Sequence, residues 1–299
     1  MSTAVVDRRP IAWGRIVAWA TIVVTVLLTV LPFWWMIRTA LSNNRALGAH
    51  ATSLLPAEIT LGAFKRVLGL QSQADALAQG GSGAAINFWL YLRNSVIVAT
   101  TSTAGQVFFS ALAAYAFARL RWPGRDKVFA LFLATLIVPP IFTNLPNFLL
   151  IKNLGLLNTF PGIVLPSFLM TPFAIFFLRQ FFLGISREIE EAAMIDGAGH
   201  GRIFFQIVLP MSAAPIATLC LLTYIASWND YFWPLLVGQD EKVRVLTVGL
   251  GVFKAQTPQG APDWAGLMAA TLIAALPILL LFLAFGKRVV NSIGFTGLK

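Results

Sequence analysis

Long apolar runs without a charged residue alternate along this chain with short polar segments. The first run, Ile16 to Ile37, is long enough to cross the hydrocarbon core of a bilayer as one helix. Five further apolar runs follow: Asn94 to Ala118, Val128 to Ile151, about Phe160 to Leu178, about Phe205 to Trp228, and Trp264 to Gly286. The pattern predicts an all-α, polytopic membrane protein with six transmembrane helices.

The first run follows three arginines, so it has the outline of a secretory signal peptide. It is longer than the apolar region of about 7 to 15 residues that such peptides carry. The sequence from Pro32 to Trp35 also lacks the small residues of a cleavage site. We therefore expect a retained first span, with its tryptophans at the outer membrane interface.

Basic residues indicate which loops face the cytoplasm. Arg119, Arg121, Arg125 and Lys127 follow the second run closely, whereas the loop after the third run holds only Lys152. The positive-inside rule then places both termini in the cytoplasm. The predicted parts are a cytoplasmic N-terminus (1–15), a first transmembrane helix (16–37), an external loop (38–93), a five-helix transmembrane domain (94–286) with a cytoplasmic loop at 179–204, and a cytoplasmic tail (287–299).

Composition and motifs exclude several functions. The chain is 58% hydrophobic and 11% charged, which is too apolar for an ordinary soluble domain. Its pI of about 10.4 comes from basic residues at the ends of apolar runs, so nucleic acid is not an expected partner, whereas membrane lipid is. A phosphate-binding P-loop, a His-Glu-x-x-His motif, a Gly-x-Ser-x-Gly motif and a Cys/His cluster are all missing, and Cys220 is the single cysteine. We expect no catalytic site, no metal and no cofactor in this chain.

The loop from 179 to 204 is the most polar segment between two apolar runs. Ser186 is a good N-cap, and Glu188, Glu190 and Glu191 suit the positive end of a helix dipole. Gly197 and Gly199 should end the helix. Ile185, Ile189 and either Ala192 or Ala193 recur at three-to-four spacing, which predicts a short helix with an apolar edge beside an acidic face.

This loop resembles the EAA loop of the membrane subunits of bacterial ABC importers. Glu191-Ala192-Ala193 is followed at the family's spacing by Gly197, Ile207 and Leu209-Pro210. The Asp196-Gly197-Ala198 segment is similar to the carbohydrate-importer branch, which includes the second maltose permease subunit. The alternative is an ordinary amphipathic connector.

The resemblance implies the type I ABC importer permease fold and a transport subunit that performs no chemistry itself. Its function would be import of a sugar or related polyol-like solute across the bacterial inner membrane. It implies a second permease subunit, two ATPase domains that bind ATP and Mg, and an extracytoplasmic solute-binding protein. The residues that it assigns to coupling with the ATPase are Glu190, Glu191, Ala192, Ala193, Asp196, Gly197, Ala198, Ile207, Leu209 and Pro210.

Two groups of polar or aromatic residues are candidates for the solute path. Asn144 and Asn147 lie beside Pro146 at membrane depth, where an amide needs a hydrogen-bonding partner. Trp228, Asn229 and Asp230 mix an aromatic ring with an amide and a carboxylate, as sugar sites do. Packing for the first group and aromatic anchoring for the second remain alternatives. Prolines within the runs, including Pro139-Pro140 and Pro172, predict helices that bend around a protein-lined cavity.

Two other functional classes are less consistent with the sequence. A polytopic membrane enzyme would need paired ionisable residues at one depth, and Asp230 is isolated. An ion-driven secondary transporter should show repeated halves with interrupted helices, and no such repeat is visible. The loop from Gly238 to Asp263 is expected to be external and, by resemblance to maltose-type relatives, to contact the binding protein.

Overall fold

The computed structural model describes residues 13–81, 86–255 and 262–294, and within these ranges the secondary structure is helical with no strand. Three stretches are single helices long and apolar enough to cross a membrane: α1 (Trp13–Ala40), α4 (Phe88–Arg119) and residues 264–286 of α15 (Trp264–Gly294). Three bent helix pairs meet the same test if each pair counts as one span. The all-α polytopic fold is therefore confirmed, with up to six spans.

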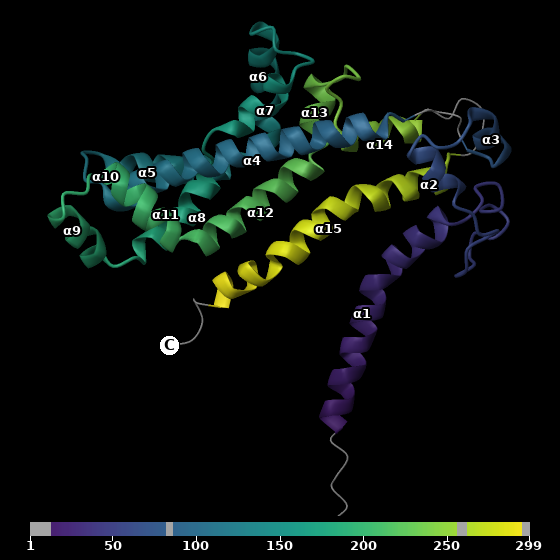
Figure 1. Cartoon of the computed structure of the whole chain (residues 1–299), viewed down its shortest axis with the longest axis horizontal. Coiled ribbons are helices and arrows are strands. Elements are labelled where there is room, and N and C mark those ends of the chain that lie inside the picture. The colour runs from purple at the N-terminus through teal and green to yellow at the C-terminus, as the bar shows by residue number, and fades with distance from the viewer. Residues whose placement is uncertain (1–12, 82–85, 256–261, 295–299) are drawn as a thin grey trace, which may run out of the picture. The chain divides into compact units, whose positions relative to one another are not determined.

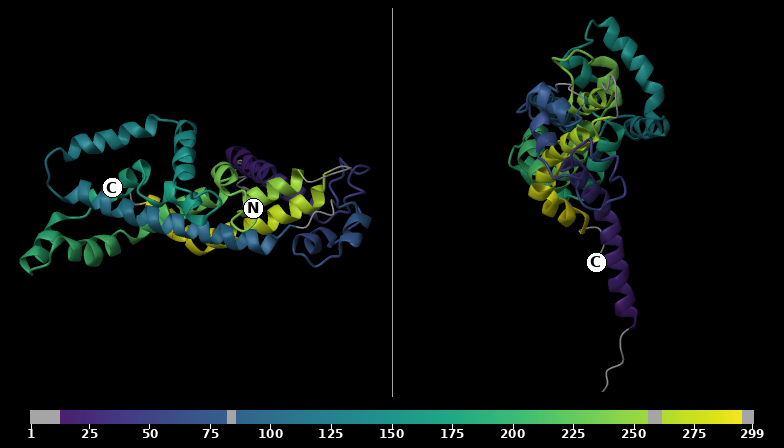
Figure 2. Two further views of the ribbon diagram at one scale, coloured as in Figure 1. Left: turned by 90° about the horizontal axis from the view of Figure 1, so that it is seen from above. Right: turned by 90° about the vertical axis from the view of Figure 1, so that its right-hand side faces the viewer.

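The three middle spans are bent, and each is broken into two helical parts. The first pair is the helical segment Arg125–Ile137, which begins with α5 (Arg125–Ala134), and α6 (Pro140–Asn153), bent by 100°. The second is α7 (Phe160–Phe168) with α8 (Pro172–Leu183), bent by 45°, and the third is the helical segment His200–Met211 with α12 (Ala213–Asn229), bent by 79°. The corner between α5 and α6 is visible in Figure 2.

Prolines explain two of these bends. Pro139 precedes α6, and Pro140 and Pro172 are the first residues of α6 and α8. A proline has no N–H and clashes with the preceding helical turn, so a helix ends before it. The expected bending at these prolines is confirmed. The third bend, at Ser212, follows a π-helical turn over Phe204–Val208 between α10 (His200–Ile203) and α11 (Leu209–Met211).

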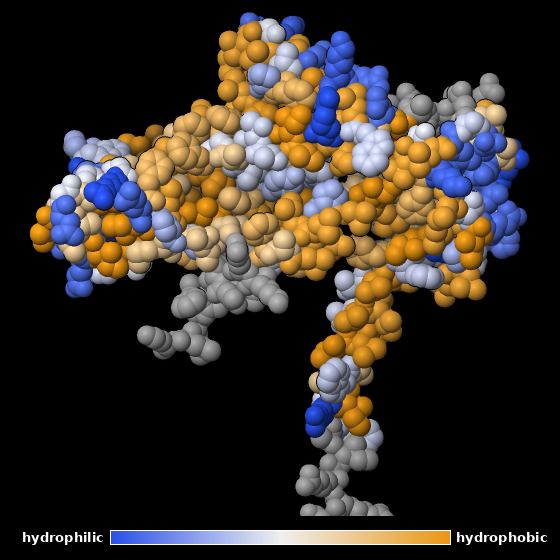
Figure 3. Space-filling model, in the orientation of Figure 1, coloured by the Kyte–Doolittle hydropathy of each residue, from blue (hydrophilic) through white to orange (hydrophobic). Residues whose placement is uncertain are grey.

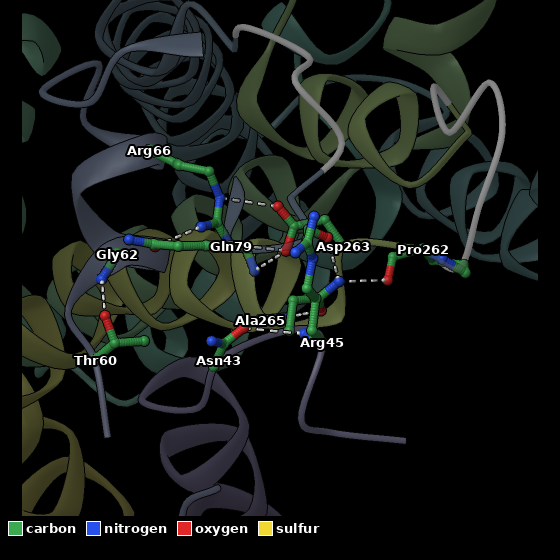
Figure 4. A network of polar contacts seen from close by, with 12 residues as sticks. Asn43, Arg45, Thr60, Gly62, Arg66, Gln79, Pro262, Asp263 and Ala265 are labelled. Atoms are coloured by element: carbon green, nitrogen blue, oxygen red, sulfur yellow. Dashed lines mark hydrogen bonds and ion pairs between the residues drawn. The ribbon is translucent and has the colours of Figure 1, made fainter. Parts of the chain in front are cut away.

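The chain divides into two compact units, residues 1–84 with 257–272 and residues 85–256 with 273–299. The first unit contains α1, α2 (Gly62–Val67), α3 (Gln73–Ala78) and the start of α15. Arg66 and Asp263 form a buried, two-pronged ion pair in which both N–O distances are 3.0 Å (Figure 4). Apolar side chains cover most of α1 (Figure 3), as expected for a helix that faces lipid.

The helices at both ends of the predicted transmembrane domain extend past the predicted apolar spans. The segment 38–93, expected to be a loop with some helix, holds α2 and α3, and α4 already begins at Phe88 instead of Asn94. The final helix continues past Gly286 to Gly294, into the segment expected to be a tail. Polar residues at these ends lower the mean hydropathy without ending the helix.

The second unit is built around α4, whose main packing partners are α8, α12 and α7 (Figure 1). Small residues permit this close packing. Ala111 and Ala114 are almost completely buried, and a Cβ added at Gly105 would lie 2.3 Å from the ring of Phe168. Small residues on one helix face allow such close approach in membrane helices. Two shorter helices, α13 (Phe232–Val237) and α14 (Leu246–Ala255), complete the unit.

Candidate functional site

The polar loop forms the helix that its sequence predicts. Helix α9 spans Arg187–Ile195, and the Ser186 hydroxyl accepts a hydrogen bond from the N–H of Glu188 at 3.3 Å. Glu188 and Glu190 lie in the first turn, where carboxylates stabilise the helix dipole. Figure 1 shows α9 at one end of the second unit, next to α10 and α11.

Gly197 closes α9 in the left-handed conformation, with φ +83°. Its N–H donates to the carbonyl of Met194 at 3.0 Å, and the next N–H, from Ala198, donates to Ala193 at 2.9 Å. These bonds satisfy the last carbonyls of the helix and reverse the chain direction. The predicted stop at glycine is confirmed.

The inner face of α9 carries a buried ion pair. Glu190 is only 5% exposed, and its Oε1 lies 2.9 Å from Nε of Arg119, the last residue of α4. The same guanidinium donates to the carbonyl oxygens of Phe182, in α8, and Ile185. One arginine therefore connects the ends of α4 and α8 with α9.

Apolar residues complete this inner face. Four of the predicted coupling residues are half-buried against the core of the second unit: Ala193, Ala198, Ile207 and Leu209. Ile185 packs there too, but Ile189 is 42% exposed. The predicted apolar edge is therefore wrong at Ile189, because Glu190 neutralised by Arg119 takes the buried position.

The outer face of α9 is available to another protein. Glu188, Glu191, Ala192 and Ile195 follow the spacing of one helical face, and all four are exposed. Ile195, which is 87% exposed, adds a large apolar side chain to this acidic face. Asp196, Gly197 and Pro210 are also exposed. A cleft of about 540 Å³ lies beside this helix, lined by Arg119, Leu120, Arg121, Trp122, Arg187, Glu190, Glu191, Met194 and His200.

A second, polar cavity of about 410 Å³ lies within the second unit. Its lining comes from α4, α7, α8 and α12: Ser102, Gln106, Ser167, Phe173, Leu222, Thr223, Ala226, Ser227 and Asp230. Ser167 donates to Ser102 at 3.2 Å, and Gln106 donates to the hydroxyl of Thr171 at 3.0 Å. The described residues include no group of three or more side chains suited to holding a metal ion.

The structure places only one predicted solute-path residue in this cavity, Asp230. Trp228 is buried and stacked on Tyr224 at 6.0 Å, and Asn229 donates to the carbonyl of Ile225 at 2.9 Å. Asn144 and Asn147 lie half-buried on α6 and are not among the lining residues, so their role stays a prediction.

Sequence analysis missed the other polar residues of this cavity. Ser102 and Gln106 are four residues apart, as are Thr223 and Ser227, so each pair lies on one helical face. That spacing was the available signal. The spacing alone does not identify a cavity, because small hydroxyl residues on one face also serve close helix packing in membranes.

Comparisons with known proteins agree with one another. The family described as binding-protein-dependent transport system inner membrane component matches residues 88–294. The probable ABC transporter permease protein YurM of Bacillus subtilis is 32% identical over 96% of this chain and 89% of its own. The diacetylchitobiose uptake system permease protein NgcG of Streptomyces coelicolor is 34% identical over 69% of this chain and 68% of its own.

Another relative is the sn-glycerol-3-phosphate transport system permease protein UgpE of Salmonella typhi. It is 36% identical over 69% of this chain and 73% of its own. Among solved structures, a chain of a bacterial ABC transporter involved in the import of the acidic polysaccharide alginate is similar with a TM-score of 0.77. The match covers 95% of this chain and 99% of that chain at 23% identity, which supports the fold alone.

Proposed function

This chain belongs to the family of inner-membrane components of binding-protein-dependent transport systems, and from that premise we propose that it is the permease subunit of an ATP-driven importer for a sugar or related polyol-like solute. Relatives named for uptake of diacetylchitobiose and sn-glycerol-3-phosphate support hydroxylated solutes. The chain itself forms part of the path and performs no bond chemistry.

The proposed assembly contains a second permease subunit, two ATPase domains that bind ATP and Mg, and an extracytoplasmic solute-binding protein. Both termini face the cytoplasm, because the basic loop between α4 and α5 follows the positive-inside rule. On this orientation α9 also lies on the cytoplasmic side, where an ATPase domain is accessible to it.

The two faces of α9 carry this proposal. The outer face, with Glu188, Glu191, Ala192 and Ile195, docks on the ATPase domain. The inner face is tied through Glu190 and Arg119 to the ends of α4 and α8. Movement of the ATPase domain is thereby transmitted to helices that also line the polar cavity.

Purification of the chain from its native membrane tests the assembly. We expect an ATPase subunit and a second permease to co-purify, and purification without any ATPase subunit would contradict the proposal. Uptake of a panel of labelled sugars, in cells that lack and then regain this chain, tests the solute class. If uptake of none of these sugars depends on the chain, the proposed solute class is wrong.

A further inference from the structure

The polar cavity has a lining suited to hydroxylated molecules. Six of its lining residues carry polar side chains: Ser102, Gln106, Ser167, Thr223, Ser227 and Asp230. Hydroxyl and amide groups both donate and accept hydrogen bonds, as sugar hydroxyls do. Phe173, which is 48% exposed, adds an aromatic ring to this lining. The volume of about 410 Å³ lies within the range of small-molecule sites.

The charge of this lining has one sign. Asp230 is the single ionisable side chain among the described residues that line the cavity, and none of them is a lysine, arginine or histidine. Its side chain accepts hydrogen bonds only from backbone N–H groups among the described contacts, those of Trp233, at 3.4 Å, and Phe232. A carboxylate without a cationic partner attracts cations and repels anions within a cleft.

We propose that this cavity is the part of the solute path that this chain contributes, and that Asp230 makes it accept neutral or cationic hydroxylated solutes while rejecting anionic ones such as sugar phosphates and uronates. The inference rests on the proposed transport function and specifies its substrate class. It places the path between α4, α7, α8 and α12, and not beside Asn144 and Asn147 on α6.

Cysteine labelling in the assembled transporter tests the cavity without knowledge of the solute. Cys220, the single native cysteine, is first replaced by alanine, and Ser227→Cys then places a thiol in the lining. Membrane vesicles of both orientations are treated, with and without ATP, with a cationic trimethylammonium and an anionic sulfonate methanethiosulfonate reagent. Each reaction rate is divided by the rate of the same reagent with free cysteine. We expect this relative rate to be at least about fivefold higher for the cationic reagent. One unit charge about 4 Å away has an effect of about this size even in bulk water.

Matched variants assign this preference to one carboxylate. Asp230→Asn should abolish it, whereas Asp240→Asn, which removes an exposed carboxylate outside the lining, should leave it unchanged. If Ser227→Cys does not assemble, Ala226→Cys provides a second position in the same lining.

Two results would overturn the inference. One is failure of both reagents to reach either position in any vesicle, because the cavity would then not be hydrated. The other is an equal rate for the two reagents, or a preference that survives Asp230→Asn. Co-purification of the ATPase subunit is measured on the same sample. Absence of the charge preference from the Ser227→Cys chain with Asp230 in place, in an intact complex, therefore refutes this inference alone.

Discussion

Gly197 is the residue at which the local backbone most directly determines the path of the chain. It is left-handed, and a Cβ added there would meet nothing within 4 Å. A substitution is therefore penalised through the backbone conformation and not through a clash. For an ordinary side chain this costs about 1–2 kcal/mol.

Gly197→Val should reduce co-purification of the ATPase subunit and lower solute-stimulated hydrolysis, because a β-branched residue disfavours the left-handed turn that leads from α9 to α10. Gly197→Asn is the matched control, since asparagine tolerates this conformation. Gly197→Asn should retain most of the co-purification and most of the solute-stimulated hydrolysis. Equal behaviour of the two variants would show that the turn is not what matters at this position.

Residue types alone predicted the ends of α9 but not the orientation of its side chains. Ser186 and Gly197 act through bonds to their own neighbours, so local sequence was sufficient. The burial of Glu190, in contrast, depends on Arg119, which lies 71 positions earlier in the chain. A helix with carboxylates on several sides gives no local indication of which one has a distant partner.

At the scale of elements, the ion pair between Arg119 and Glu190 holds three helix ends together. Removing one partner leaves the other charge buried, which typically costs about 3–5 kcal/mol. Glu190→Leu and Arg119→Met should therefore each lower the thermal stability of the solubilised complex. The double variant should be more stable than the sum of the two losses predicts, because apolar replacement of a whole buried pair is often neutral.

Lys127→Met is the control for this cycle, since Lys127 is exposed and lies outside the outer face of α9. Its effect on stability should stay within about 0.5 kcal/mol. Additive losses in the Arg119 and Glu190 variants would mean that the two side chains do not act as a pair.

The bends of the middle spans were only partly predictable. Pro139, Pro140 and Pro172 marked two break points because proline acts on its own backbone. The 79° turn at Ser212 lies between Pro210 and Pro215 and follows the π-helical turn over Phe204–Val208, which no residue type indicates. The polar cavity was missed for a similar reason, since its residues come together only when four helices are assembled.

At the scale of the whole molecule, the loop from Gly238 to Asp263 is the predicted contact with the solute-binding protein. Helix α14 occupies part of this loop, and residues 256–261 of the loop lie outside the described residues. Shortening residues 255–260 should weaken stimulation of ATP hydrolysis by loaded binding protein while basal hydrolysis is preserved. Unchanged stimulation would exclude this loop from that contact.

The most direct measurement of the central claim compares Glu191→Lys with the unaltered chain in the assembled transporter. Glu191 is exposed on the outer face of α9, so the substitution should leave membrane insertion and thermal stability intact. Reversing a charge at a docked interface costs up to several kcal/mol. We therefore predict at least about a tenfold loss of ATPase co-purification and of solute-stimulated hydrolysis. Normal co-purification and normal stimulation in this variant would contradict the claim that α9 couples this chain to an ATPase.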